Sequence, residues 1–170
     1  MARLFVAALP SPETTAMLRS IPKPDHDGVR WVPDGNWHVT LRFIGEAERT
    51  RVIDLLDDAE LPAAEAVLGP RTEWLGGQLV VPVAGVDDLA AAVRAATASI
   101  GGHDSNPFRG HLTIARTRRG RAAPAAGSEV SARFAVTEVA VVESDLRPTG
   151  AVYTPLATCP VGESFRLRRD

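Results

Sequence analysis

The chain has 170 residues, of which 45% are hydrophobic and 24% are charged, values that are ordinary for one folded domain. Nineteen basic and 21 acidic residues give a formal net charge of −2, which excludes nucleic-acid binding through bulk positive charge. The single cysteine, Cys159, cannot form an internal disulfide and has no nearby Cys or His partners for structural zinc. We therefore expect one domain over residues 1–170.

The first elements expected along the chain are a strand and a helix. Residues 4–9 form an apolar run of strand length that Pro10 stops, too short for the apolar part of a signal sequence. Ser11 followed by a proline suits the start of a helix. Residues 22–35 are rich in proline and glycine, which predicts a surface loop. Because no apolar run of 18 residues occurs, we expect a cytoplasmic protein without a membrane partner.

A half-buried strand is expected over residues 37–44, where polar and apolar side chains alternate. The alternation assigns two faces, a polar one and an apolar one: His38, Thr40 and Arg42, against Val39, Leu41 and Phe43. An amphipathic helix follows over residues 47–59, because apolar residues recur there at helical spacing. Residues 71–75 and 78–83 then form a hairpin through Gly76-Gly77.

The second half of the chain is expected to contain one helix and mostly strands. The helix begins near Asp87 and Asp88 and stops at Gly101-Gly102. The strand over residues 111–115 repeats the earlier alternation: His111, Thr113 and Ala115 on one face, Leu112 and Ile114 on the other. Further strands are expected over residues 134–136, 139–143, 152–155 and 164–167. The order of elements indicates an α+β fold with mostly antiparallel sheets.

Two of the four histidines are followed two positions later by threonine. The copies read His38-Val39-Thr40-Leu41 and His111-Leu112-Thr113-Ile114, and in a strand each histidine shares a face with its threonine. If the copies face each other, one imidazole can accept a proton and the other can donate one, while the two hydroxyls bind phosphate oxygens. The pair therefore predicts metal-free in-line displacement at phosphorus.

Taken alone, each histidine could have a purely structural role, as a half-buried strand residue whose ring is hydrogen-bonded to the backbone or to threonine. For the two motifs together a functional role is the better explanation, because chance would have to produce the same residues, at the same spacing and on the same strand face, twice. His26 and His103 lie in loops without partners at useful spacing, and we expect them to be solvated. The chain contains no nucleophile elbow, P-loop or HExxH motif, so serine hydrolases, kinases and metalloproteases are excluded.

Longer stretches around the two motifs resemble one known family over nearly the whole chain. They are RWVP at 30–33, WHVTLRFIGE at 37–46, Phe108 and HLTIAR at 111–116, framed by RLFVA at 3–7, ESDL at 143–146 and GAVY at 150–153. They resemble the RNA 2′,3′-cyclic phosphodiesterases, the LigT-like 2′-5′ RNA ligase family within the two-histidine phosphoesterases. Residues 63–85 match only loosely. The resemblance implies a bilobal α+β fold in which two pseudo-symmetric lobes of antiparallel sheet, flanked by helices, surround a central cleft.

The resemblance also implies an activity, which is hydrolysis of an RNA-terminal 2′,3′-cyclic phosphate to a 2′-phosphate without a metal or other cofactor. On the family pattern, His38 donates a proton to the departing 3′ oxygen and His111 activates water. Thr40 and Thr113 bind the phosphate. The residues alone do not order the two histidines. Three alternatives stay open: 2′-5′ RNA ligation, a phosphodiesterase for small cyclic nucleotides, and a non-catalytic RNA-end binder.

The expected partners are RNA ends bearing a 2′,3′-cyclic phosphate, such as those of tRNA fragments, or small cyclic nucleotides, and the expected state is a monomer. Residues 116–128 lack apolar periodicity and carry Arg116, Arg118, Arg119 and Arg121, so they predict an exposed basic loop that can hold RNA phosphates. A plain soluble loop in an arginine-rich chain is the alternative.

Four aromatic residues are candidates for stacking on a terminal base. They are Phe5, Trp31, Trp37 and Tyr153. The hydrophobic core is the better expectation for each of them taken alone. Phe5 and Tyr153 are the two that we carry forward as substrate-binding candidates.

Overall fold

The computed structural model describes residues 1–103, 105–117 and 126–162. Its elements are, in chain order, β1 (Ala2–Ala8), α1 (Pro12–Arg19), β2 (Val29–Trp31), a 3-10 helix (Asp34–Asn36), β3 (Val39–Ala47), α2 (Arg49–Asp57), β4 (Ala64–Leu68), β5 (Glu73–Leu75), β6 (Gln78–Ala84), α3 (Asp87–Ala96), β7 (His111–Thr117), β8 (Ala132–Val136), β9 (Glu138–Arg147) and β10 (Gly150–Pro160). Residues 118–125 of the expected basic loop, with Arg118, Arg119 and Arg121, and the expected strand 164–167 lie outside the described residues.

The strands form one antiparallel sheet of ten strands in the order β10-β9-β1-β3-β7-β6-β4-β8, with β2 beside β7 and β5 beside β6. Only Val39 of β3 is paired with Leu112 of β7 along the described ladder between these two strands. We therefore divide the sheet there into lobe one (β10-β9-β1-β3) and lobe two (β7-β6-β4-β8, with β2 and β5). The expected α+β fold with two lobes of antiparallel sheet is confirmed.

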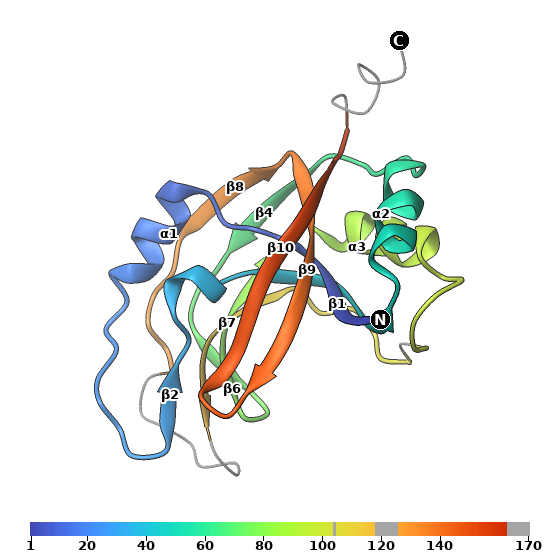
Figure 1. The fold of residues 1–170 in the computed structure, drawn as a ribbon. Helices are drawn as coiled ribbons and strands as arrows, with labels where there is room; N and C mark the ends of the chain where they lie inside the picture. The colour runs from blue at the N-terminus through green and yellow to red at the C-terminus, as the bar shows by residue number, and fades with distance from the viewer. Residues whose placement is uncertain (104, 118–125, 163–170) are drawn as a thin grey trace.

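The helices cover the lobes from two sides (Figure 1). Helix α1 packs against β8 of lobe two, whereas α3 packs against β3 and α2 against β10 of lobe one. Ser11 begins α1 as the sequence predicts, because its hydroxyl accepts a hydrogen bond from the Thr14 backbone N–H at 3.2 Å. None of the helices among the described residues is long and apolar enough to cross a membrane.

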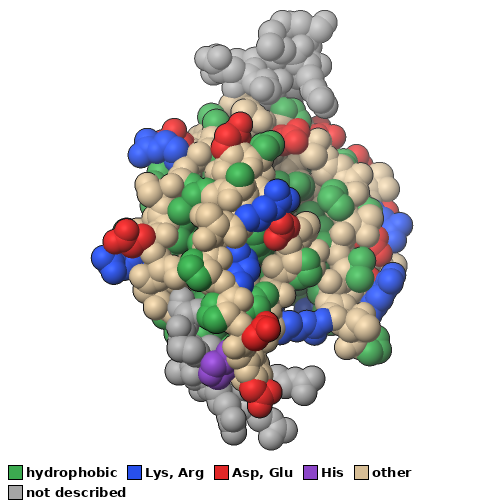
Figure 2. All heavy atoms as spheres, turned by 90° about the vertical axis from the view of Figure 1, so that its left-hand side faces the viewer, with side chains coloured by type: hydrophobic (Ala, Val, Ile, Leu, Met, Phe, Trp, Pro, Cys, Tyr) green, Lys and Arg blue, Asp and Glu red, His purple; other side chains and the backbone are tan. Residues whose placement is uncertain are grey.

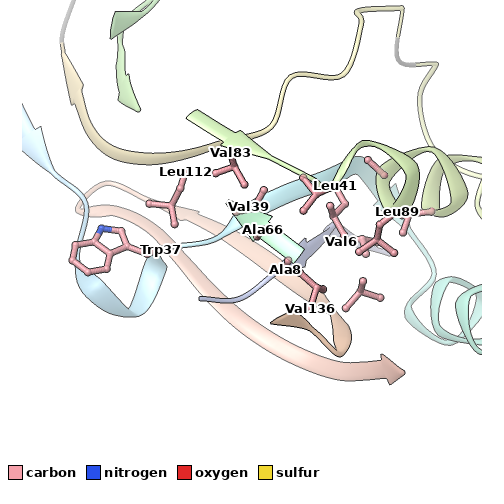
Figure 3. Close-up of a cluster of buried hydrophobic side chains, with 14 of the residues drawn as sticks. Val6, Ala8, Trp37, Val39, Leu41, Ala66, Val83, Leu89, Leu112 and Val136 are labelled. Carbon is pink, nitrogen blue, oxygen red and sulfur yellow. The ribbon is translucent and has the colours of Figure 1, made fainter. Parts of the chain in front are cut away.

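One hydrophobic core runs behind both lobes, on the face of the sheet that the helices cover. Figure 3 shows side chains of β1, β3, β4, β6 and β7 meeting in it, with Val39 and Leu112 near the junction of the lobes. Val39, Leu112 and Ile114 are completely buried. Full burial of one such side chain contributes about 1.5–3 kcal/mol, so the motif strands are anchored from behind by their aliphatic residues.

The opposite face of the sheet carries the polar residues of both motifs, and we call it the cleft face. A second, small cluster of buried residues lies on this face in lobe one, formed by Phe5, Ala7, Ala140 and Val142 with Tyr153 packed against it. Seen from the side of α1, the described surface carries acidic and basic side chains interspersed rather than in one broad patch (Figure 2). This agrees with the near-neutral net charge.

Each motif strand contains a β-bulge directly after its threonine. The ladder pairs around the extra residue are Ala7–Thr40 and Val6–Arg42 in lobe one, and Val80–Thr113 and Leu79–Ala115 in lobe two. Leu41 and Ile114 are therefore the extra residues, at the same position of the two motifs. A bulge changes which face the following side chains occupy, and bulges are common beside active sites.

The alternation predicted from the sequence is wrong beyond each threonine because of these bulges. Arg42 does not share the cleft face with His38: it is only 5% exposed and donates hydrogen bonds to the Thr97 and Ile100 carbonyl oxygens beyond the end of α3. Phe43 turns out instead and is 47% exposed. In lobe two Ala115 is completely buried, and Arg116 takes the exposed position.

Two short strands were also missed by the sequence prediction. Strand β2 lies within the expected loop 22–35, and β4 lies between the expected helix 47–59 and the hairpin. Strand β2 has only three residues and exists through its pairing with β7, in which Arg30 lies opposite Arg116. The hairpin of β5 and β6 through Gly76-Gly77 is confirmed.

Candidate active site

The junction between the lobes brings the two His-x-Thr motifs together. Because Val39 lies opposite Leu112 in an antiparallel ladder, continuing the same register past this single pair would set His38 opposite Thr113 and Thr40 opposite His111. His38 and Thr113 do line one groove together. In this register the two imidazoles lie on one diagonal of a four-residue group, and the two hydroxyls lie on the other.

Both histidines are held in the same way. The Nδ1 atom of His38 donates to the Asn36 carbonyl oxygen at 2.7 Å, and Nδ1 of His111 donates to the Arg109 carbonyl oxygen at 2.7 Å. A carbonyl oxygen only accepts hydrogen bonds, so Nδ1 carries the hydrogen in each ring and Nε2 is left for proton transfer. Nε2 of His38 lies 3.0 Å from Thr40 Oγ1. The repeated anchor means that the two rings present the same atom.

His38 sits in an aromatic pocket on the lobe-one side. Its ring centroid is 4.7 Å from that of Phe5 and 5.3 Å from that of Tyr153, and these two rings are 5.1 Å apart in an edge-on contact. Phe5 is only 4% exposed and Tyr153 is half-buried. Both aromatic substrate-binding candidates from the sequence thus lie beside His38, and the Phe5 ring packs against its imidazole.

The surroundings of His38 favour its neutral form in the free protein. Burial lowers the pKa of His38, the hydrogen bond to the Asn36 carbonyl raises it, and repulsion from Arg116 and His111 lowers it further. The net direction is below the ordinary value for histidine. A negatively charged group bound between these residues would act in the opposite direction.

In lobe two the neighbour of the motif is an amide instead of an aromatic ring. The Thr113 hydroxyl donates to Gln78 Oε1 at 2.8 Å. Gln78 lies opposite Arg116 in the β6–β7 ladder, just as Phe5 lies opposite Phe43 in the β1–β3 ladder. The sequence prediction did not single out Gln78 or Phe43, since their places follow from strand pairing and bulges rather than from spacing in the chain.

Two grooves meet at His38, Arg116 and Tyr153. The first has a volume of about 410 Å³, runs along the cleft face of lobe one and reaches Thr40, Phe43 and Arg3. The second, of about 200 Å³, has Thr113 and Trp31 in its walls together with the turn between β9 and β10.

The remaining candidates from the sequence are distributed as follows. Arg116 lines both grooves and forms no ion pair among the described residues. Trp31 is half-buried in the wall of the second groove, whereas Trp37 is 2% exposed and belongs to the core. His26 and His103 are exposed, as expected. In the described part of the chain, no three residues among the His, Cys, Asp and Glu side chains come together as a metal site.

Comparisons with known proteins point in one direction. A family model described as LigT like Phosphoesterase matches residues 9–66. A curated protein of Geobacillus stearothermophilus named RNA 2′,3′-cyclic phosphodiesterase is 28% identical over 163 aligned positions, which cover 79% of this chain and 50% of the relative. The chain thus spans about half the length of that relative.

Solved structures match over nearly the full length. A crystal structure from Thermus thermophilus is 28% identical with a TM-score of 0.77, covering 95% of this chain and 99% of that one. The crystal structure of E. coli LigT complexed with 3′-AMP is 26% identical with a TM-score of 0.74 and the same two coverages, 95% and 99%. Together with the paired motifs at the junction of two lobes, these matches support a relationship to the LigT-like two-histidine phosphoesterases.

Proposed function

We propose that the protein hydrolyses a 2′,3′-cyclic phosphate at an RNA end to a 2′-phosphate. The observation that carries the proposal is the arrangement of His38 and His111. Both rings are anchored through Nδ1 to the carbonyl two residues earlier, which leaves Nε2 of each ring for proton transfer, and Nε2 of His38 lies 3.0 Å from Thr40 Oγ1. Paired imidazoles of this kind can take up and release protons in one displacement, each contributing about 10²–10⁴-fold in rate.

The aromatic side of the site indicates where the nucleoside lies. The first groove joins His38 to Phe5, Phe43 and Tyr153, so it offers apolar surface for a ribose and base beside His38. In an in-line displacement the attacking and leaving oxygens lie on opposite sides of the phosphorus. His38 is then next to the departing 3′ oxygen, and His111 is on the side from which water attacks.

The reaction balances with these two histidines. His111 Nε2 takes a proton from water as the water oxygen bonds to phosphorus. The bond between phosphorus and the 3′ oxygen breaks, and His38 Nε2 gives its proton to that oxygen. The Thr40 hydroxyl and the Arg116 guanidinium donate hydrogen bonds to the non-bridging oxygens, where negative charge develops. The Thr113 hydroxyl joins them when its single hydrogen turns from Gln78 Oε1 to a phosphate oxygen.

The low pKa of His38 in the free protein is consistent with an acid whose protonated form is favoured by a bound anion. Burial and the neighbouring Arg116 guanidinium hold the pKa of His38 below its ordinary value. The anionic cyclic phosphate binds beside Arg116 and offsets its repulsion, so it favours protonated His38 in the complex. Proton donation is thereby coupled to occupation of the site by an anion.

The comparisons support the choice of substrate. The Geobacillus stearothermophilus relative is named RNA 2′,3′-cyclic phosphodiesterase, and E. coli LigT has been crystallised with 3′-AMP. A terminal nucleotide with a 2′,3′-cyclic phosphate contains both features, the cyclic phosphate of the first name and the nucleoside phosphate of the second. The same chemistry supports small cyclic nucleotides as a second substrate class, since the first groove need hold only one nucleoside.

A second candidate function is 2′-5′ RNA ligation, in which an RNA 5′-hydroxyl replaces a water molecule. The second groove supports it, because this space adjoins Thr113 and Arg116 and is lined by Trp31. An acceptor nucleoside bound there could present its hydroxyl to the phosphorus. Hydrolysis needs no such acceptor and stays the first proposal.

The test is the pH–rate profile on a short RNA ending in a 2′,3′-cyclic phosphate, in EDTA, with the position of the product phosphate identified. We expect a bell-shaped profile and a 2′-phosphate as the sole hydrolysis product. A second RNA with a free 5′-hydroxyl, added in a parallel reaction, measures joining. Absence of turnover across the pH range in both reactions would contradict both candidate functions and favour an RNA-end binder.

A further inference from the structure

Arg3 is a second unpaired cation of the first groove. It lies on β1 two residues before Phe5, is exposed, and lines the groove at the end away from Thr113. Its guanidinium carbon is 4.9 Å from the centroid of the Phe43 ring. Glu46 lies opposite Arg3 in the β1–β3 ladder, yet Arg3 forms no ion pair within the described chain. The guanidinium thus turns over the aromatic ring and keeps its donors available.

The groove therefore alternates in chemistry along its length. It begins at Arg116 with His38, continues over the aromatic rings of Phe5 and Phe43, and reaches Arg3. A strand rises about 3.3 Å per residue, so Arg3 lies about 7 Å beyond Phe5 along β1. A cation, an aromatic floor and a second cation match a phosphate, a nucleoside and a second phosphate.

We propose that Arg3 binds the 5′-phosphate of the terminal nucleotide, whose cyclic phosphate reacts between His38 and His111. The inference rests on the proposed function, because it takes the first groove as the place of the reacting nucleoside. An RNA end carries this second phosphate as the linkage to the preceding nucleotide. Arg3 thus makes the site selective for RNA ends over nucleoside 2′,3′-cyclic phosphates that have a free 5′-hydroxyl.

The experiment compares three substrates that differ only at the 5′ position of adenosine 2′,3′-cyclic phosphate: a free hydroxyl, a phosphate and a methyl phosphodiester. The diester carries the single charge of an RNA linkage. The measured quantity is the ratio of kcat/KM with and without the 5′ group, at fixed ionic strength. In the wild type we expect a ratio of about ten, the size of one charge-assisted contact.

Arg3→Gln removes the proposed contact, and Arg51→Gln is the matched control. Arg51 is an exposed arginine of α2, which covers the opposite face of lobe one, and it forms no ion pair among the described residues. We expect the ratio to fall to about one in Arg3→Gln and to stay near ten in Arg51→Gln. A wild-type ratio near one, or a ratio that survives in Arg3→Gln, would overturn the inference.

A binding measurement separates this inference from the proposed function. By calorimetry, adenosine 3′,5′-bisphosphate should bind the wild type about ten-fold more tightly than adenosine 3′-phosphate, and Arg3→Gln should abolish the difference. This outcome without any turnover would retain the 5′-phosphate site and reject the hydrolase. Turnover without a bisphosphate advantage would retain the hydrolase and reject the role of Arg3.

Discussion

The two lobes carry the same His-x-Thr motif and differ in the residues that lie beside it. Each has a His-x-Thr pair, an Nδ1 anchor to the carbonyl two residues earlier and a bulge after the threonine. At the two adjoining positions lobe one has Phe5 and Phe43, and lobe two has Gln78 and Arg116. The two motifs are thus nearly symmetric, whereas the walls beside them are aromatic in lobe one and polar in lobe two. We infer that the walls, and not the motifs, give a substrate its direction.

The largest expected effect tests the symmetric part of this comparison. His38→Ala and His111→Ala should each lower kcat on an RNA 2′,3′-cyclic phosphate by about 10²–10⁴-fold, since each removes one proton-transfer group. The double variant should lose little more than either single one, because both groups act in one step. Steady-state kinetics measures kcat, and calorimetry with adenosine 3′-phosphate should show that binding persists.

His26→Ala is the control for these variants, since His26 is exposed in the loop before β2. It should retain wild-type kcat. Substantial turnover in either His38→Ala or His111→Ala would break the comparison, because one lobe would then supply the chemistry alone.

The next effect sharpens the difference between the walls. Arg116→Gln removes a charged donor to the phosphate and should lower kcat/KM by about 10–100-fold for any 2′,3′-cyclic phosphate.

Phe43→Ala removes aromatic surface beneath a base and should lower kcat/KM by about ten-fold for a nucleoside substrate. With methyl riboside 2′,3′-cyclic phosphate, which has no base, the Phe43→Ala effect should vanish.

The decisive quantity in that experiment is the dependence on the base. If the fall in kcat/KM depends on the base in Arg116→Gln and not in Phe43→Ala, then the base lies against the polar wall and our assignment of the two walls is wrong. Leu146→Ala serves as a control for lost apolar surface, because Leu146 is 61% exposed and lines the outer part of the same groove. Its effect should be smaller than that of Phe43→Ala.

A smaller effect is expected for Gln78, which orients Thr113 through the 2.8 Å hydrogen bond. Gln78→Leu leaves the Thr113 hydroxyl without that partner and should lower kcat by about three- to ten-fold with little change in KM. Gln78→Glu keeps an acceptor but adds a negative charge beside the phosphate, and should raise KM instead. If both variants changed kcat by the same factor and KM by the same factor, Gln78 would act only through folding.

The smallest expected effect concerns pH. Arg116 is one cause of the low pKa of His38, so Arg116→Gln should raise that pKa. As the proton donor, His38 must be protonated, and this form is lost as pH rises through its pKa. The alkaline limb of kcat/KM should therefore move to higher pH by about half a pH unit, while Arg51→Gln leaves it in place. A shift to lower pH would contradict the assignment of His38 as the acid.

The sequence was sufficient to predict the motif strands, the start of α1 at Ser11 and the α+β fold, because these depend on local periodicity and capping. It was insufficient beyond Thr40 and Thr113, because counting by two assumes an uninterrupted ladder. The bulges at Leu41 and Ile114 are properties of the paired strands. Arg42 was consequently assigned to the cleft face, although it is buried near the end of α3.

The walls of the site were harder to predict than the motifs for a related reason. Gln78 and Phe43 acquire their places only when β6 meets β7 and β1 meets β3. Nothing in the spacing of residues along the chain marks them. The sequence did mark Phe5, Tyr153 and Arg116, and the structure brings all three to the first groove with His38. Their roles in substrate binding stay predictions.

The ladder that joins the lobes through Val39 and Leu112 lies directly beside the two motif histidines. Any change in the angle between the lobes is therefore a rotation about an axis next to the two histidines. Such a rotation displaces the distant ends of the walls, such as Arg3, far more than it displaces the imidazoles. If the lobes rotate in this way, the distance between the two imidazoles should change less than the width of the first groove at Arg3.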